Sequence, residues 1–167
     1  NYTLQRQLAK ELVDRRFVIG NFDKRYVDCL NECLIGLGYT KEQNDAIIDE
    51  NYINNYNEFI TPFISSNSHL LENYLVNEFF RNQYPMNESH KAWNSFLELC
   101  IILGMLIFLL NGISGYAKNM NTTIFLRCVQ SFSKAVIHNQ GFIKNAVKDL
   151  QNRGLDTLAY MSVLVKV

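Results

Sequence analysis

The sequence predicts an all-α protein, a compact bundle of about eight helices around one buried apolar helix. Three observations carry this prediction. Apolar residues recur with helical spacing along most of the chain, and alternating apolar and polar residues, the sign of a half-buried strand, are almost absent. One run near the middle of the chain, from Leu99 to Leu110, is continuously apolar. The 167 residues and their 48% hydrophobic content suffice for one ordinary core.

The expected helices follow in order from stripes of apolar residues, from residues that cap helix starts and from glycines that end helices. A stripe of leucines opens the chain, and a second stripe ends at the Gly36–Gly38 turn. Thr40 with Gln43 resembles a capping box that opens a third helix. Asn121 is suited to cap a later helix, and Gly154 stands where a left-handed residue ends one. The helices are expected at about 4–19, 22–37, 40–59, 70–84, 92–113, 121–138, 142–152 and 156–165.

One segment is the natural boundary between two lobes. Ser65 to Ser68 is a run of serine and asparagine that is typical of a loop. We therefore expect an N-terminal helical lobe at 1–64 and a C-terminal helical lobe at 65–167, which together form one domain. The chain begins with Asn1 rather than methionine, which suggests a piece of a longer protein.

Composition argues against several kinds of partner. Sixteen basic and sixteen acidic residues cancel, so the basic excess of a nucleic-acid-binding protein is missing. The continuous apolar run is shorter than the roughly 18 to 20 residues that a membrane crossing needs, which favours a core helix. No signal segment opens the chain, so a cytoplasmic location is the expectation.

The usual patterns of catalysis and metal binding are not found. Cys29 and Cys33 stand one helical turn apart, but a third cysteine of a radical-cluster pattern would occupy position 36, which is Gly36. The three histidines, His69, His90 and His138, are scattered, outside any metal-binding spacing. We therefore expect no metal site and no bound cofactor in this chain, and name no catalytic residue.

A polar stripe on the expected helix at 70–84 is the best candidate for a contact surface. Asn73, Asn77 and Arg81 follow each other at intervals of four residues, and Glu78 is close to the same line. Such a stripe is either a hydrated helix face or a surface that contacts a substrate or a neighbouring domain.

Several ordered segments resemble the C-terminal part of flagellin lysine-N-methylases. These are the segment from Leu71 to Pro85, with its Leu-Val and Asn-Gln-Tyr-Pro elements, the sequence Gln-Ser-Phe-Ser-Lys at 130–134, His138-Asn139, and the ending from Leu155. They cover about the last hundred residues, whereas the first sixty match only in being helical. Tyr84 and Ile137 depart from the family pattern, in which phenylalanine and an acidic residue are usual.

The resemblance implies a cytoplasmic enzyme that methylates lysine side chains of flagellin with S-adenosylmethionine as methyl donor. It also implies a cysteine-rich N-terminal region that holds an iron–sulfur or other metal cluster, and that region has no counterpart here. This chain alone is then expected to be inactive and to serve as a substrate-docking or structural domain. Its candidate contact residues are Asn73, Asn77, Arg81, Ser133, Lys134 and His138.

Two alternatives from other functional classes remain open. One is a helical effector-binding domain like those of transcriptional regulators, which needs an internal apolar pocket. The other is an adaptor bundle without catalytic activity, which is favoured if the polar stripe proves fully hydrated and binds nothing.

Overall fold

The chain folds into packed helices, as a computed structural model shows for residues 2–18, 23–40, 44–85 and 92–166. Secondary structure in these ranges is entirely helical, which confirms the all-α prediction. Because π-helical turns join α3 to α4 and extend α6, the described residues form seven continuous helices. The elements are α1 Tyr2–Val18, α2 Lys24–Leu37, α3 Asp45–Asn55, η1 Tyr56–Ile60, α4 Thr61–Arg81, α5 Ala92–Ala117, α6 Thr122–Phe132, η2 Ser133–Ile137, α7 Gln140–Asn152 and α8 Leu158–Leu164.

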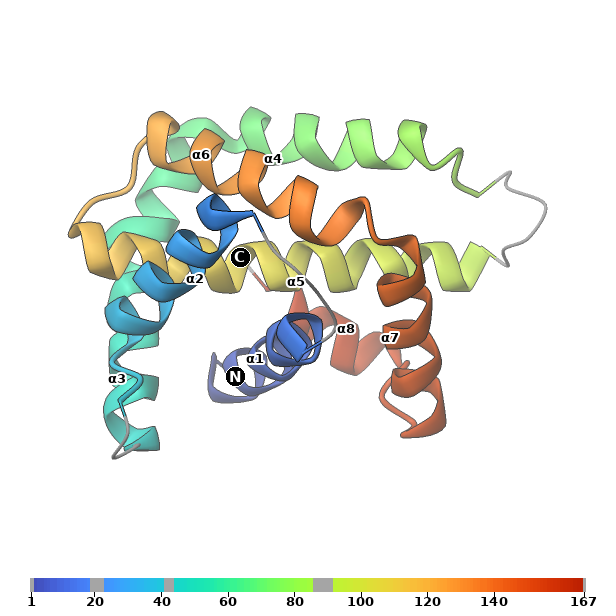
Figure 1. The fold of residues 1–167 in the computed structure, drawn as a ribbon, viewed down its shortest axis with the longest axis horizontal. Coiled ribbons are helices and arrows are strands. Elements are labelled where there is room, and N and C mark those ends of the chain that lie inside the picture. The colour runs from blue at the N-terminus through green and yellow to red at the C-terminus, as the bar shows by residue number, and fades with distance from the viewer. Residues whose placement is uncertain (1, 19–22, 41–43, 86–91, 167) are drawn as a thin grey trace.

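Helix α5 is the central element, as predicted. It runs across the middle of the molecule in Figure 1, with α4 and α6 above it, α1 below it, and α7 and α8 toward one end. Every residue from Cys100 to Gly115 is buried, so this helix is apolar around its whole circumference because other helices surround it. The predicted buried helix at 92–113 is confirmed and continues to Ala117.

The complete α5 helix is longer than its apolar run suggested. With 26 residues it is long and apolar enough to cross a membrane by length and composition alone. Other helices, however, bury 89% of its most apolar window. The core helix of a globular protein passes the same length test, so this burial favours a core role for α5.

Small residues let α2 approach α5 closely at their crossing. A methyl group on Gly112 would lie 2.4 Å from Cys33 Sγ, and one on Gly36 would lie 2.0 Å from the Gly112 carbonyl oxygen. Buried Asn111 connects α5 to α3, because its Nδ2 donates to the carbonyl of Tyr52 in α3 at 3.0 Å. The α2–α5 contact is the most extensive between any two elements of the described structure.

The predicted loop at 65–68 is wrong, since α4 continues through it. Asn67 departs from helical geometry (φ −137°, ψ 35°), and this kink bends the helix without ending it. The Asn67 side chain donates to the Phe63 carbonyl at 2.9 Å and so replaces a backbone interaction. Pro62 lies in the first turn of α4, directly after the π-helical turn η1, and the helix continues through it. The division into lobes 1–64 and 65–167 stays a prediction.

Side-chain caps mark several helix starts. Asn121 caps α6 as predicted, since its Oδ1 accepts from the Ile124 N–H at 3.0 Å. The third helix begins later than predicted, because Asn44 rather than Thr40 is its N-cap. The capping partner expected at Gln43 lies outside the described residues, as does the segment 86–91 between the helices expected at 70–84 and 92–113.

Candidate functional site

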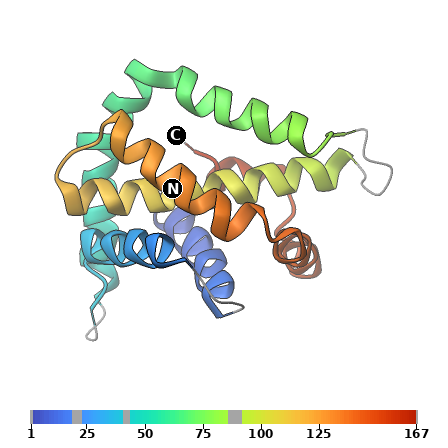
Figure 2. The ribbon, with the colours of Figure 1, turned by 45° about the horizontal axis from the view of Figure 1, so that its top comes forward.

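The six predicted contact residues lie on two neighbouring parts of the fold. In Figure 2, α6 lies between α4 and α2, so the α6–η2 helix has α4 on one side and α2 on the other. Three of the residues are exposed on α4, two lie on η2, and one follows η2 directly. The first three are Asn73, Asn77 and Arg81; the others are Ser133, Lys134 and His138.

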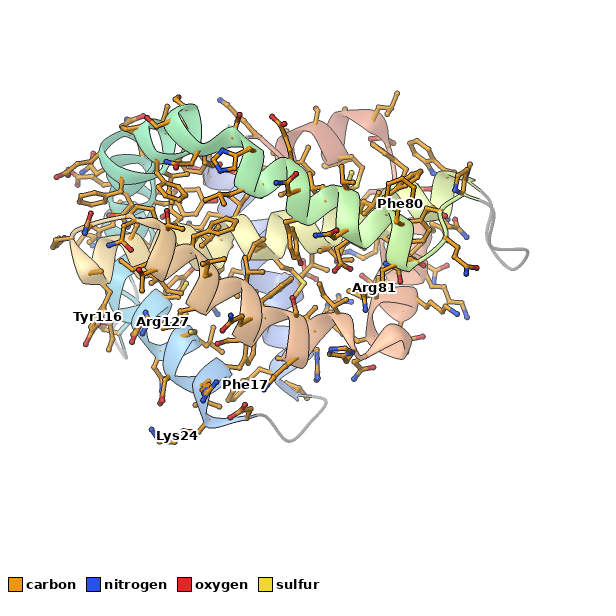
Figure 3. All side chains as sticks on the ribbon, turned by 90° about the horizontal axis from the view of Figure 1, so that it is seen from above. Phe17, Lys24, Phe80, Arg81, Tyr116 and Arg127 are labelled. Carbon is orange, nitrogen blue, oxygen red and sulfur yellow. The ribbon has the colours of Figure 1, made fainter. Side chains whose placement is uncertain are left out.

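Glu78 does not belong to the exposed stripe of α4. It is buried, on the same side of the helix as Leu71 and Tyr74. Its carboxylate forms an ion pair with Arg81, whose side chain is 40% exposed. Figure 3 shows Arg81 at the end of α4 that lies beside the end of α6. Arg81 is therefore anchored by Glu78, while Asn73 and Asn77 remain exposed.

A second buried carboxylate lies close by, at the start of α5. Glu98 is buried and accepts a hydrogen bond from the Tyr84 hydroxyl. Burial raises the pKa of Tyr84 well above its usual value, and the hydrogen bond to Glu98 raises this pKa further. This pair could not be recognised in the sequence, because Tyr84 lies in the turn after α4, Glu98 lies in α5, and the two share no motif.

The phenol of Tyr74 connects α4 with η2. Burial raises the pKa of Tyr74, and the nearby Glu78 carboxylate acts in the same direction. The nearby Ser133 hydroxyl acts in the opposite direction and lowers the same pKa. The Tyr74 hydroxyl has no hydrogen-bond partner among the described residues.

These two tyrosines predict opposite effects of the same substitution. We expect Tyr74→Phe to leave stability unchanged or to raise it by about 1 kcal/mol, because it removes a buried hydroxyl without a partner. We expect Tyr84→Phe to lower stability by about 2 kcal/mol, because the buried Glu98 loses a donor. Urea unfolding followed by circular dichroism measures both. A larger loss for Tyr74→Phe than for Tyr84→Phe would contradict this assignment.

The segment η2 is a π-helical turn that ends the α6 helix. The His138 N–H donates to the Ser133 carbonyl, five residues earlier, at 3.2 Å. From α1, the buried Arg16 guanidinium donates to the Ala135 carbonyl, with Nε at 2.8 Å. Such π-helical turns occur frequently at functional sites. Arg16 thus fixes the position of the turn that carries Ser133 and Lys134.

A groove of about 840 Å³ separates the facing surfaces of α2 and α6. Arg127 and Glu32 form an ion pair across one part of it, and the Cys29 thiol meets the Ser131 hydroxyl at 3.7 Å in another. The later residue of α2 in these pairs, Glu32, meets the earlier residue of α6, Arg127, so the two helices run antiparallel. Figure 3 shows the two helices beside each other, with Lys24 and Arg127 on this face.

Ser133 and Lys134 line this groove together with Arg25. Because the helices are antiparallel, the start of α2 and the η2 turn lie at the same end of the groove. Neither Lys134 nor Arg25 forms an ion pair with any described residue, so this end offers two available cations. The structure therefore brings Ser133 and Lys134 together in a surface groove, while Asn73 and Asn77 lie on α4, outside it.

The cysteines do not fit the metal cluster that the family resemblance implies. The described residues contain no group of three or more side chains placed to hold a metal ion. Burial raises the pKa of the Cys29, Cys33 and Cys128 thiols, and that of Cys100 to about 11. Cluster ligands are thiolates, which burial of this kind disfavours. No step of a reaction is assigned to such a cluster in this domain.

Fold and site together define an all-helical domain with a surface groove beside a π-helical turn. The chain belongs to the family described as FliB lysine N-methylase C-terminal domain, whose model matches residues 1–164. This match includes the first sixty residues, in which no motif pointed to the family. No curated protein and no solved structure matches the chain.

Proposed function

We propose that this domain docks flagellin for a methylase that modifies flagellin lysine side chains. The family supplies the reaction class, since it is that of the C-terminal domain of a lysine N-methylase. The groove between α2 and α6 is the observation that carries the docking role. It is large enough for a segment of a protein, and Ser133 and Lys134 from the Gln-Ser-Phe-Ser-Lys sequence line it.

The methyl transfer itself is assigned to the rest of the methylase. Lysine methylation needs a deprotonated amine aligned with the methyl donor. In this proposal S-adenosylmethionine supplies the methyl group in the cytoplasm, and the cysteine-rich N-terminal region holds the donor and any iron–sulfur cluster. The domain contributes by holding flagellin near that region, which raises the effective concentration of the target lysines.

Calorimetric titration of the 167-residue chain with purified flagellin, without added cofactor, tests the docking role. We expect saturable binding. We expect Lys134→Glu to weaken it about tenfold, because the substitution replaces an available cation in the groove by an anion. Lys134 is exposed, so the variant should unfold at nearly the same temperature as the parent chain.

Lys148→Glu is the matched control, because it makes the same charge change at an exposed position on α7, outside the groove. Asn77→Ala separately tests the exposed stripe on α4. No detectable heat with flagellin would refute the docking role and leave the domain as a structural support. Equal weakening by Lys134→Glu and Lys148→Glu would show a general charge effect and remove the groove from the proposal.

A further inference from the structure

We propose that the groove between α2 and α6 binds an amphipathic helix of the protein substrate, with the acidic C-terminal end of that helix beside Arg25 and Lys134. The proposal rests on the docking role proposed above and names the kind of segment that docks. Four features of the groove support it: its backbone, its size, its apolar surface and the distribution of its charges.

The backbone of the groove favours a helix over an extended peptide. Both sides of the groove are helices, α2 and the α6–η2 helix. Their backbone N–H and C=O groups are used within each helix, so the groove offers no free strand edge. An extended peptide that binds by strand addition needs such an edge, whereas an amphipathic helix binds a groove through side chains alone.

The size of the groove also suits a helix. Its lining residues on the α6–η2 helix run from Thr123 to Lys134, and an α-helix rises about 1.5 Å per residue, so this side is about 17 Å long. A bound helix of that length and about 10 Å diameter occupies about 1300 Å³. The groove of about 840 Å³ would therefore hold somewhat more than half of the volume of such a helix. An amphipathic helix buries about this much of its surface and leaves its polar face in water.

Apolar side chains on α6 supply the contact surface for the apolar face of such a helix. Leu126 lines the groove and is 46% exposed. Val129 lies three residues later, half-buried, on the same side. Polar Gln130 adjoins them. Together they form a short apolar strip with a polar margin.

Charge gives the bound helix a direction. Two acidic residues also line the groove, but Asp28 is paired with Lys24 at 3.0 Å, and Asp23 accepts a hydrogen bond from the backbone N–H of Arg25 as N-cap of α2. The side chains of Arg25 and Lys134 thus leave an excess of positive charge at one end. The C-terminus of a helix carries partial negative charge, and acidic side chains there add to it. The bound helix therefore places that end beside the two cations.

Hydrogen exchange of flagellin, alone and saturated with the 167-residue chain, tests this proposal. We expect one contiguous flagellin segment of about three helical turns to become protected. Leu126→Glu should weaken binding at least tenfold, because it places a charge on the apolar strip. Single alanine substitutions through the protected segment should weaken binding at positions i, i+3, i+4 and i+7. The double variant Arg25→Glu, Lys134→Glu of this chain should bind flagellin weakly. A flagellin variant in which an acidic residue at the C-terminal end of the protected segment is replaced by lysine should restore that binding.

The possible outcomes separate the two proposals. If flagellin binds but the sensitive positions alternate with a period of two, or Leu126→Glu binds like the parent chain, the helix proposal is overturned and the docking role survives. If flagellin does not bind at all, both are overturned. Sedimentation also tests whether the chain forms a dimer. If Leu126→Glu abolishes such a dimer and added flagellin does not dissociate it, the occupant of the groove is a second copy of the chain, and the helix proposal is overturned. Far-ultraviolet circular dichroism confirms that each variant is folded.

Discussion

Gly112→Ala is expected to destabilise the protein strongly, because it overpacks the crossing of α2 and α5. The added methyl group would lie 2.4 Å from Cys33 Sγ and 2.5 Å from the Cys33 carbonyl oxygen. The second contact is with backbone, so α2 and α5 must move apart. Overpacking of this kind costs about 3 kcal/mol, which corresponds to a fall in melting temperature of about 10 °C for a chain of this size. Thermal unfolding followed by circular dichroism measures it.

Gly141→Ala is the matched control for this prediction. A methyl group on Gly141 would meet only the Asn139 side chain, at an ordinary distance of 3.5 Å. Alanine has a higher helix propensity than glycine, so this variant should be as stable as the parent chain or more stable by about 0.5 kcal/mol. If the Gly112→Ala and Gly141→Ala variants have the same melting temperature, α2 and α5 do not cross as closely as the structure has them.

Helix α5 was predictable because its signal is local. A long apolar run can only be a core or membrane helix, and its residues need no partner to be recognised. The continuation of α4 through Ser65–Ser68 was not predictable in this way. A serine-rich run favours a loop in isolation. Here the buried residues on both sides, Phe63 and Leu71, hold the segment in a helix, and Asn67 absorbs the bend.

The candidate site was predictable only where it lies within one motif. Ser133 and Lys134 were found because they stand in a recognisable segment, and the groove contains both. Arg25 was missed, because it lies in α2 and only the antiparallel packing of α2 and α6 brings it to the same end of the groove. Glu78 was placed in the exposed stripe because helical spacing tells which residues share a face of a helix. It does not tell which face packs against α5. Such pairings depend on tertiary structure that a single sequence does not contain.

Arg16→Met is expected to lower both stability and flagellin binding. Arg16 is 119 residues from Ala135 in the sequence, yet its guanidinium donates to the Ala135 carbonyl through Nε and Nη2. Methionine keeps much of the apolar stem but leaves this carbonyl without its donors. The expected loss is about 2 kcal/mol, measured by urea unfolding. Because the carbonyl belongs to η2, the turn that carries Ser133 and Lys134 becomes less well fixed, and calorimetric titration should show weaker binding.

A second destabilised variant separates a positioning role of Arg16 from a general loss of stability. Met161→Ala removes a buried side chain from α8, which lies outside the groove, and costs about 2 to 5 kcal/mol. It should bind flagellin like the parent chain at temperatures where it is folded. Arg16→Lys retains the charge but replaces the two-pronged donor by a point charge, so its binding should fall between the other two. If Arg16→Met and Met161→Ala bind flagellin equally well, Arg16 contributes to stability alone.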